Sequence, residues 1–353
     1  MRPRDFVRIA AGAGFAVALI AASVASEATP ALAAGLNSRL VPGSQEAVAC
    51  LSPRLCAVAG YNTSGVGDVV PVRSGVPGPS EALAGTTSVY DLSCPGTVGC
   101  VAIADPSSGA GLLVARLTPD GAIASSTPVK VPAGVVLSRV SCATLSSCVL
   151  TGVDVFASPE KLEVADWVGG ALTLHPVAVP SDVSDIALRG ISCSGHSCLA
   201  VGYGMKGTET EGLVISISGG LPTHLGVVSG DSFYGDSCGS PTLCYAVGFD
   251  SAGGVVVAVS HGTPGTAVGV HSDLFGVACR ATSCEAFGQQ LAPQGSPAGV
   301  IYYGTVVDLS AGKVTSVQLV PLSAGFTSAS QSGGTFTAVG AAQHKGSEIT
   351  TGS

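Results

Sequence analysis

Residues 191–202 read ISCSGHSCLAVG, and the same pattern recurs along the whole chain. In each copy a short run ends in a cysteine, four or five residues follow, and a second cysteine opens a C-x-A-V-G-like run. The first cysteines of six copies lie 41 to 51 residues apart, a period that indicates an array of small supersecondary units. A seventh copy, SASQSGGTFTAVG, has no cysteine. Ser330 and Phe336 are predicted to stand where its pair belongs.

The fourth copy shows how one unit is expected to fold. Residues 188–193 and 198–202 read as two short strands around the turn 194–197, and residues 212–218 and 225–229 read as a third and a fourth strand. Glycine and proline bound these runs, as is typical of strands and turns. No segment after residue 34 has a helical apolar stripe, so the chain is predicted to be all-β.

Four strands in about 45 residues form the unit of a β-propeller blade. The chain is therefore predicted to be a seven-bladed propeller, with repeats that start near residues 46, 90, 138, 189, 234, 275 and 326. The seventh repeat ends after its third strand, SEITTG. We expect Asn37–Pro42 to supply its fourth strand, so that N-terminal and C-terminal strands close the ring in one blade.

The recurring motif S-C-x(4,5)-C-x-A-V-G resembles that of secreted bacterial β-propeller repeat proteins with one disulfide hairpin per blade. The resemblance covers residues 36–353. The chain lacks the GH…WD signature of WD40 blades and the S-x-D-x-G-x-x-W box of sialidase-type blades. The resemblance implies an architecture, and it transfers no catalytic residue.

Each cysteine pair flanks a tight turn, where two facing strands bring cysteines within reach of each other. Structural zinc is the alternative, but the four- or five-residue spacings differ from C-x2-C and no histidine recurs in register. We predict one disulfide in each of six repeats, joining Cys50 to Cys56, Cys94 to Cys100, Cys142 to Cys148, Cys193 to Cys198, Cys238 to Cys244 and Cys279 to Cys284.

Residues 1–33 read as a signal peptide. Three arginines precede the apolar run 9–25, and Ala31-Leu32-Ala33 supplies a small-x-small cleavage pattern. We predict cleavage near Ala33, a single propeller domain over residues 34–353, and a secreted, monomeric mature protein that does not associate with a membrane. An uncleaved membrane anchor is the alternative.

The charge content limits the classes of partner. Charged residues make up 11% of the chain, and the formal net charge is −8. Loss of residues 1–33 removes three arginines and two acids, which gives −9. A nucleic-acid partner would need clustered lysine and arginine, so none is expected. The predicted partner is an extracellular protein, a glycan or a component of the cell envelope.

The candidate ligand site lies four residues before each first cysteine, where the innermost strand is expected to enter near one mouth of the channel. Those positions hold Glu46, Tyr90, Ser138, Arg189, Tyr234, Phe275 and Phe326. Adjoining positions add Asp91, Arg139 and Asp236. Such side chains could bind a ligand on a rigid scaffold, or they could be inter-blade packing and rim decoration.

Other constellations point to no chemistry. Gly235-Asp236-Ser237-Cys238-Gly239 resembles the surroundings of a chymotrypsin-like serine, but Ser237 fills a repeat position also held by Ser93, Ser141 and Ser192. The six histidines fall at unrelated positions. Asp154, Asp182 and Asp185 form no D-x-D-x-D-G calcium loop. No metal site, cofactor or catalytic residue is predicted.

Three functions stay open on the sequence. The first is a secreted, non-catalytic binding protein with its partner at the loops and channel mouth. The second is an extracellular hydrolase or lyase that uses Glu46, Asp91 or Asp236 as acid or base with Arg139 or Arg189. The third is a structural protein of the cell envelope.

Overall fold

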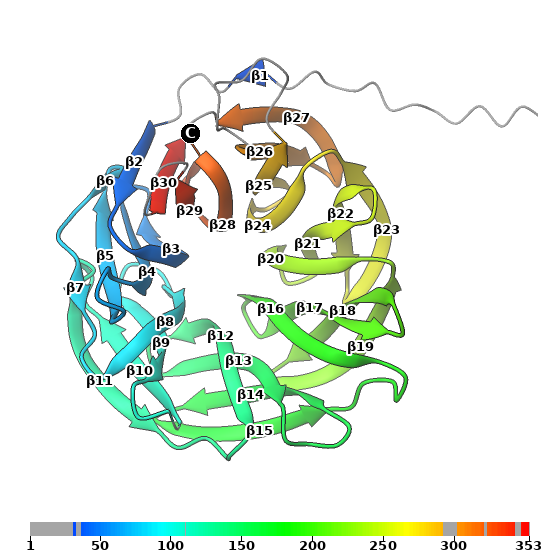
Figure 1. Cartoon of the computed structure of the whole chain (residues 1–353), viewed down its shortest axis with the longest axis horizontal. Helices are drawn as coiled ribbons and strands as arrows, with labels where there is room; N and C mark the ends of the chain where they lie inside the picture. The colour runs from blue at the N-terminus through cyan, green and yellow to red at the C-terminus, as the bar shows by residue number, and fades with distance from the viewer. Residues whose placement is uncertain are drawn as a thin grey trace, which may run out of the picture.

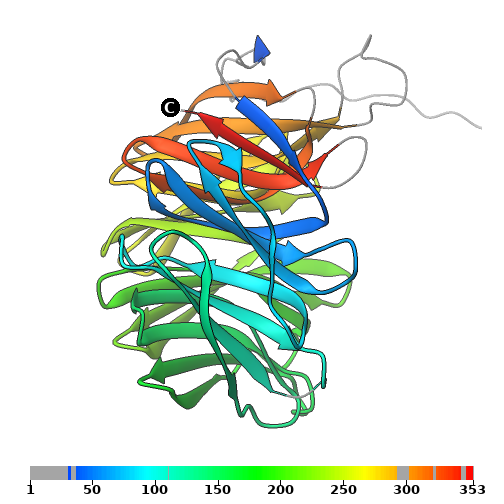
Figure 2. The same cartoon turned by 90° about the vertical axis from the view of Figure 1, so that its left-hand side faces the viewer.

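The computed structural model describes residues 31–32, 37–109, 111–291, 302–320, 323–342 and 347–352. These residues form only strands, turns and loops. Seven sheets are arranged around a central axis as a β-propeller, which confirms the predicted fold (Figure 1). Figure 2 shows the same disk from its side.

Within each blade the strands follow the chain from the axis outward, and consecutive strands are antiparallel neighbours. The first three blades contain β3 (Ser44–Ser52), β4 (Leu55–Tyr61), β5 (Gly67–Arg73), β6 (Val76–Pro77) and β7 (Glu81–Ala82); β8 (Thr86–Ser93), β9 (Cys100–Pro106), β10 (Leu112–Leu117) and β11 (Ile123–Val129); and β12 (Val135–Thr144), β13 (Ser147–Asp154), β14 (Lys161–Val168) and β15 (Ala171–Val177).

The next three blades repeat this order. They contain β16 (Ser184–Ser194), β17 (Ser197–Lys206), β18 (Glu209–Ser218) and β19 (Leu221–Ser229); β20 (Ser232–Ser240), β21 (Leu243–Asp250), β22 (Gly253–Ser260) and β23 (Thr263–Val270); and β24 (Asp273–Arg280), β25 (Ser283–Leu291), β26 (Tyr302–Ser310) and β27 (Lys313–Val320). A short strand, β1 (Ala31–Leu32), lies parallel to β27 at the outer edge of the sixth blade.

The seventh blade combines strands from both ends of the chain. Its inner strands are β28 (Ser323–Ser332), β29 (Thr335–Ala342) and β30 (Ser347–Gly352). Its outermost strand is β2 (Asn37–Val41), which pairs antiparallel with β30 from Asn37 opposite Thr351 to Val41 opposite Ser347. Residues 1–30 of the predicted signal peptide, and Ala33, lie outside the described residues, so export and cleavage stay predictions.

The core consists of seven hydrophobic clusters, one between each pair of neighbouring blades. Between the third and fourth blades, for example, Val149 and Leu162 pack with Leu188 and Leu213. Valine, leucine and alanine dominate most of these clusters, and successive residues of an inner strand join the clusters on opposite sides of the blade, as Ala57 and Val58 do. Aromatic rings gather between the sixth and seventh blades, where Phe287 lies 6.1 Å from Phe326 and 5.0 Å from Phe336 between ring centroids.

Six disulfides close the hairpins between the innermost and second strands, each within its own blade. The predicted pairing is confirmed, and no described cysteine is free. Six disulfides are typical of a chain that folds in an oxidising compartment.

The seventh hairpin differs from the prediction by one residue. Gln331, not Ser330, faces Phe336, and Ser330 faces Thr337. The turn is therefore one residue shorter than in an alignment on Ser330, and it matches the five-residue separation of Cys193 from Cys198 and of Cys279 from Cys284. The same shift moves the seventh candidate site position from Phe326 to Thr327.

This register predicts which cysteine pair would add a seventh disulfide. Gln331→Cys with Phe336→Cys should form a bridge and lose two hydrogens by intact mass, because these residues are facing partners. Removal of the buried Phe336 ring costs about 3–5 kcal/mol, and a short-loop bridge offsets only about 2 kcal/mol. The bridged variant should therefore be less stable than the parent.

The matched control is Ser330→Cys with Phe336→Cys, which should keep both thiols free in a thiol titration. If the control forms the bridge and the first variant does not, then Ser330 rather than Gln331 faces Phe336, and the shorter turn is wrong.

Candidate functional site

One β-bulge in every innermost strand places the candidate site residues. At an equivalent position in each blade, the pairing with the second strand skips one residue, between Leu188 and Gly190 in the fourth for example. A bulge leaves that residue unpaired and redirects its side chain. The seven bulged residues are Glu46, Tyr90, Ser138, Arg189, Tyr234, Phe275 and Thr327.

The recurring glycine of A-V-G lies opposite the residue that precedes the bulge, where the two strands approach closely. In six blades, a Cβ on that glycine would lie 1.8–2.0 Å from a backbone carbonyl oxygen at the start of the innermost strand. Only glycine permits this approach without a shift of the backbone. In the second blade Ala104 occupies the position, opposite Val89, and the bulge at Tyr90 is still present, so the glycine favours the close approach but is not required for the bulge. The sequence motif and the bulge are therefore parts of one local structure.

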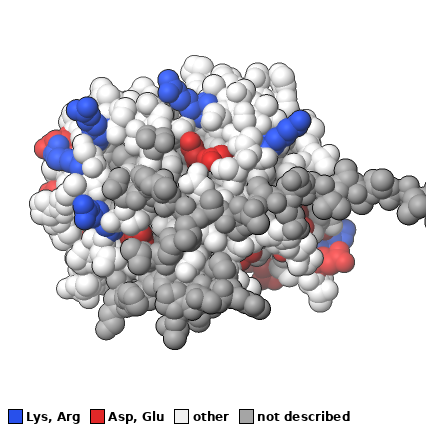
Figure 3. Space-filling view, turned by 90° about the horizontal axis from the view of Figure 1, so that it is seen from above, with Lys and Arg blue, Asp and Glu red and all other residues white. Residues whose placement is uncertain are grey.

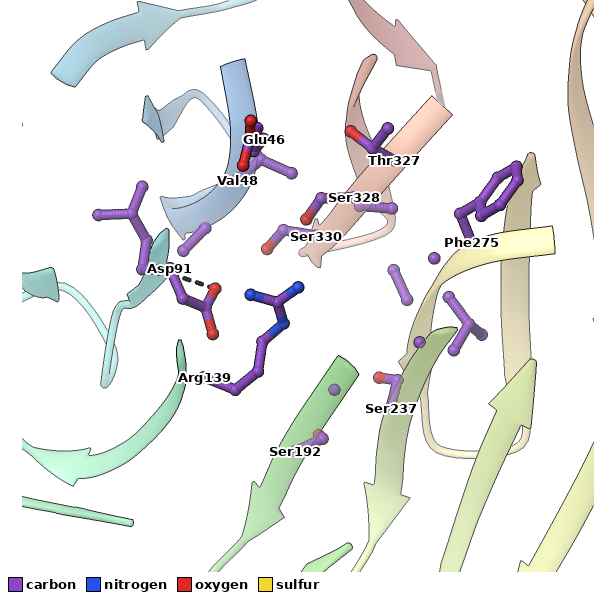
Figure 4. A pocket seen from close by; sticks show the side chains of 18 of the residues that line it. Glu46, Val48, Asp91, Arg139, Ser192, Ser237, Phe275, Thr327, Ser328 and Ser330 are labelled. Carbon is purple, nitrogen blue, oxygen red and sulfur yellow. Dashed lines mark hydrogen bonds between the residues drawn. The ribbon is translucent and has the colours of Figure 1, made fainter. Parts of the chain in front are cut away.

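Six of the bulged residues, all except Ser138, line a central cavity of about 660 Å³ (Figure 4). They lie at the end of the channel where the innermost strands begin. We call this side of the disk the bulge face, and the side that carries the disulfide turns the hairpin face. Phe326, which was expected at the mouth, is instead fully buried in the core between the sixth and seventh blades, because Thr327 is the bulged residue.

Four aromatic rings form a continuous wall on the bulge face over the fourth, fifth and sixth blades, and two of them, Tyr234 and Phe275, line the cavity. Tyr234 is central, with its ring centroid 5.6 Å from Tyr203, 4.9 Å from Phe249 and 5.5 Å from Phe275. Phe249 also lies 5.9 Å from Phe275. All four side chains are half-buried, so part of each ring meets solvent. We call these four residues the aromatic wall.

Arg189 lies at one end of the aromatic wall. Its guanidinium carbon is 5.4 Å from the Tyr203 ring centroid and 6.0 Å from that of Tyr234, and Nη2 donates to the Tyr203 hydroxyl at 3.0 Å. Stacking on two rings and a hydrogen bond hold the cation in place. Arg189 and Tyr234, both predicted site residues, therefore belong to one cluster.

Asp91 and Arg139 face each other deeper in the channel (Figure 4). Asp91 accepts hydrogen bonds from the backbone amides of Leu92 at 2.9 Å and Val140 at 2.8 Å. Arg139 Nε donates to the Arg189 carbonyl at 2.6 Å, and Nη1 donates to the Ser138 carbonyl at 2.8 Å. Burial raises the pKa of Asp91, and the Arg139 guanidinium opposes this rise. Both side chains thus tie neighbouring blades together.

Asp236 packs against Gly190 of the neighbouring blade, where a Cβ would come within 2.4 Å of Oδ1. Both carboxyl oxygens are inaccessible to solvent and have no hydrogen-bond partner of good geometry. Burial, with a further contribution from the Asp91 carboxylate, raises the pKa of Asp236 well above its usual range. A neutral carboxylic acid between two blades is the form that this environment favours.

The opposite side of the mouth, over the first and second blades, is acidic. Glu46 is exposed, and Tyr90 lies near the Asp105 carboxylate. Burial, followed by the effect of Asp105, raises the pKa of Tyr90. The mouth is therefore asymmetric, with carboxylates on one side and the aromatic wall on the other.

The serine before the first cysteine links neighbouring blades. In five blades its hydroxyl accepts a hydrogen bond of 2.9–3.1 Å from the amide of the next blade's innermost strand; the acceptors are Ser93, Ser141, Ser192, Ser237 and Ser330. Ser237 accepts from Cys279, so its place in a GDSCG string reflects blade packing. Ser330 belongs to this set, which agrees with the register of the seventh hairpin.

The structure brings most of the predicted site residues into one channel and adds others. Thr327, Tyr203 and Phe249 were not predicted. Tyr203 and Phe249 directly follow the recurring glycine, at the end of the second strand next to the bulge. A comparison of that position between repeats would have found them. Among the described residues, no group of three His, Cys, Asp or Glu could hold a metal ion. No described helix is long and apolar enough to cross a membrane.

Comparisons with solved structures find other propellers. The chain is similar to a structure titled "YCF48 bound to D1 peptide", with a TM-score of 0.57 and 10% identity over 91% of this chain and 98% of that one. It is also similar to a structure of U3-55K, with a TM-score of 0.59 and 12% identity over 91% and 99%. Hydrazine synthase of Kuenenia stuttgartiensis gives a TM-score of 0.57 and 10% identity over 84% and 94%.

Identities this low show the fold alone. No protein-family profile matches the chain, and no curated protein sequence matches it.

Proposed function

We propose that this chain is an exported, non-catalytic binding protein that holds a polypeptide partner on its bulge face. The observation that carries the proposal is the aromatic wall. Four half-buried aromatic side chains lie side by side on the bulge face, two of them lining the cavity, in a chain with only one Trp, seven Tyr and nine Phe. Partly exposed aromatic clusters with an adjacent arginine are typical of interface anchors.

The scaffold supports a binding role. The bulged side chains project from seven sheets, six of which are braced internally by a disulfide, and five serine hydrogen bonds join neighbouring blades. A preformed surface loses little conformational entropy when a partner binds. One structurally similar propeller, YCF48, is bound to a peptide, which agrees with a polypeptide ligand for this fold.

The carboxyl groups of the channel favour binding over hydrolysis. Asp91 uses its oxygens to accept two backbone amides, and both oxygens of Asp236 are buried against the neighbouring blade. A general acid or base must reach the proton that it transfers. Glu46 is exposed. Glycoside hydrolysis needs a second carboxyl group on the other side of the bond that is cleaved, and no described contact places one opposite Glu46.

An unbiased peptide selection tests this function. A random peptide library displayed on phage would be selected on the intact, disulfide-bonded protein, and the affinity of recovered peptides would be measured by calorimetry. Tyr234→Ser combined with Phe249→Ser should weaken binding at least tenfold, about 1.4 kcal/mol, because it removes the centre of the aromatic wall.

The control variant is Val98→Ser, at a residue that is 58% exposed on the hairpin face, and it should bind like the parent. Thermal unfolding would verify that all variants are folded. Failure to recover any peptide, or equal affinity in the Tyr234/Phe249 variant, would contradict the proposed function.

A further inference from the structure

The bulge face carries a large excess of acidic side chains. Six aspartates reach solvent there, at the strand ends or in the adjoining loops: Asp105, Asp154, Asp182, Asp185, Asp250 and Asp273. Three glutamates join them: Glu46, Glu160 and Glu209. The described bases on this face are Lys130, Lys161, Arg189 and Lys206. Nine acids therefore face four bases, and Lys206 is already paired with Asp182 at 2.9 Å.

The hairpin face lacks this acidic excess. Among its described residues, Arg54, Arg73, Arg116, Arg280 and Lys313 are exposed. Four acids oppose them there: Asp120 is exposed, the exposed Glu81 accepts from the Ile123 amide at the start of β11, and Asp166 and Asp308 are half-buried at equivalent positions of β14 and β26. Acidic and basic side chains are both scattered over the part of the rim that Figure 3 shows. The channel adds little net charge, since Asp91 and Arg139 cancel formally. The charge of the disk is thus polarised along its axis.

An acidic surface around an aromatic centre favours a cationic ligand. Carboxylates attract lysine and arginine over a distance of about 10 Å at moderate ionic strength. Aromatic faces stabilise such cations once they are close. The aromatic wall already holds one cation in this way, because the Arg189 guanidinium stacks on Tyr203 and Tyr234.

We infer that the partner on the bulge face is a basic polypeptide segment, whose lysine or arginine side chains meet the acidic rim while apolar or cationic groups contact the aromatic wall. The inference rests on the proposed function and adds the chemical class of the partner. Arg189 is a cation at this site, but its guanidinium is held by the Tyr203 hydroxyl and by two rings. The bulge face keeps an excess of acidic side chains when Arg189 is counted, so the preference for a basic ligand remains.

Three synthetic peptides would test the inference. They have equal length, share the same tryptophan and leucine positions, and carry lysine, glutamine or glutamate at the other positions. The lysine peptide should bind the intact protein at least about tenfold more tightly than the glutamine peptide, and the difference should shrink in molar NaCl. Asp250→Asn with Asp273→Asn, next to the aromatic wall, should weaken only the lysine peptide, by about threefold to tenfold.

The matched control is Asp120→Asn with Asp166→Asn on the hairpin face, which should leave the affinity unchanged. A different result is that the glutamate peptide binds as tightly as the lysine peptide or more tightly, and loses this binding in the Tyr234→Ser/Phe249→Ser variant. That result would overturn the inference and leave the proposed function intact. If the Tyr234→Ser/Phe249→Ser variant still binds the lysine peptide with the parent's affinity, the peptide contacts another surface and the inference is overturned.

A second copy is the competing occupant, since the exposed arginines on the hairpin face of one disk complement the acidic bulge face of another. Sedimentation velocity without peptide would reveal it. A concentration-dependent, salt-sensitive assembly that the Asp250→Asn/Asp273→Asn variant abolishes would assign the face to self-association and overturn the inference. A single monomeric species supports it.

Discussion

Deletion of residues 34–43 is expected to destabilise the whole propeller, out of proportion to a ten-residue loss. The deletion removes β2, the outermost strand of the seventh blade, and leaves the edge of β30 unpaired. It also removes Val41, which is 1% exposed and packs with Val339 and Ile349. Loss of one buried valine and a five-residue ladder should cost at least about 4 kcal/mol, a large part of a typical total.

We expect aggregation or early proteolysis from the C-terminal end, measured by limited proteolysis with mass spectrometry and by thermal unfolding. Two adjacent residues give a finer test. Val41→Ser should lower the melting temperature clearly, whereas Leu40→Ser, at a side chain that is 66% exposed, should change it little. A deletion variant that stays monomeric and keeps its melting temperature would show that β2 does not hold the ring together.

Most of the fold could be predicted from the repeat, because each copy specifies its own local structure. Paired cysteines define a hairpin, the A-V-G glycine favours the close approach of two strands beside the bulge, and the next apolar run supplies the third strand. These signals act within about 45 residues and recur six times, so the seven blades and six disulfides were predictable. One residue of register in the seventh hairpin was not, since without cysteines nothing in the sequence marks the shorter turn between Gln331 and Phe336.

The candidate site was predictable only in part, for a related reason. Counting four residues back from the first cysteine gives the bulged residue in six blades; in the seventh, which has no cysteine, counting back from Ser330 gave Phe326 instead of Thr327. Tyr203 and Phe249 come from second strands, and their contact with Tyr234 depends on how adjacent blades approach. Distances between blades are a tertiary property that no single repeat encodes.

The second large effect is a pH dependence of stability that we expect from Glu285. Its carboxyl group is paired with that of Asp308 on the side of the sixth blade that faces the seventh. Glu285 of β25 faces Asp308 of β26 across the sheet, and Gln331 Nε2 of the seventh blade donates to Glu285 Oε2 at 2.9 Å. Asp308 in turn accepts hydrogen bonds from Ser316 and Gln318. Burial, with a further contribution from the Asp308 carboxylate, raises the pKa of Glu285 to about 7.

The sign of the pH effect follows from this raised pKa. The folded protein holds a proton on Glu285 that the unfolded chain, with a pKa near 4.5, has already released. The contribution to stability is therefore fully present below about pH 4.5 and is lost as the pH rises through about 7. Such a shift corresponds to about 3 kcal/mol, and solvent around this half-buried group reduces it to about 1–2 kcal/mol.

Glu285→Gln is expected to raise the free energy of unfolding by about 1–2 kcal/mol at pH 8.5 and to change it little at pH 4.5. The neutral amide removes the repulsion from Asp308 and keeps an oxygen that can accept from Gln331. Urea unfolding with the disulfides intact would measure both values. Glu209→Gln, at an exposed residue of β18, is the control and should show no such pH dependence. An equal effect of Glu285→Gln at both pH values would mean that Glu285 is ionised in the folded protein at acidic pH, contrary to the raised pKa.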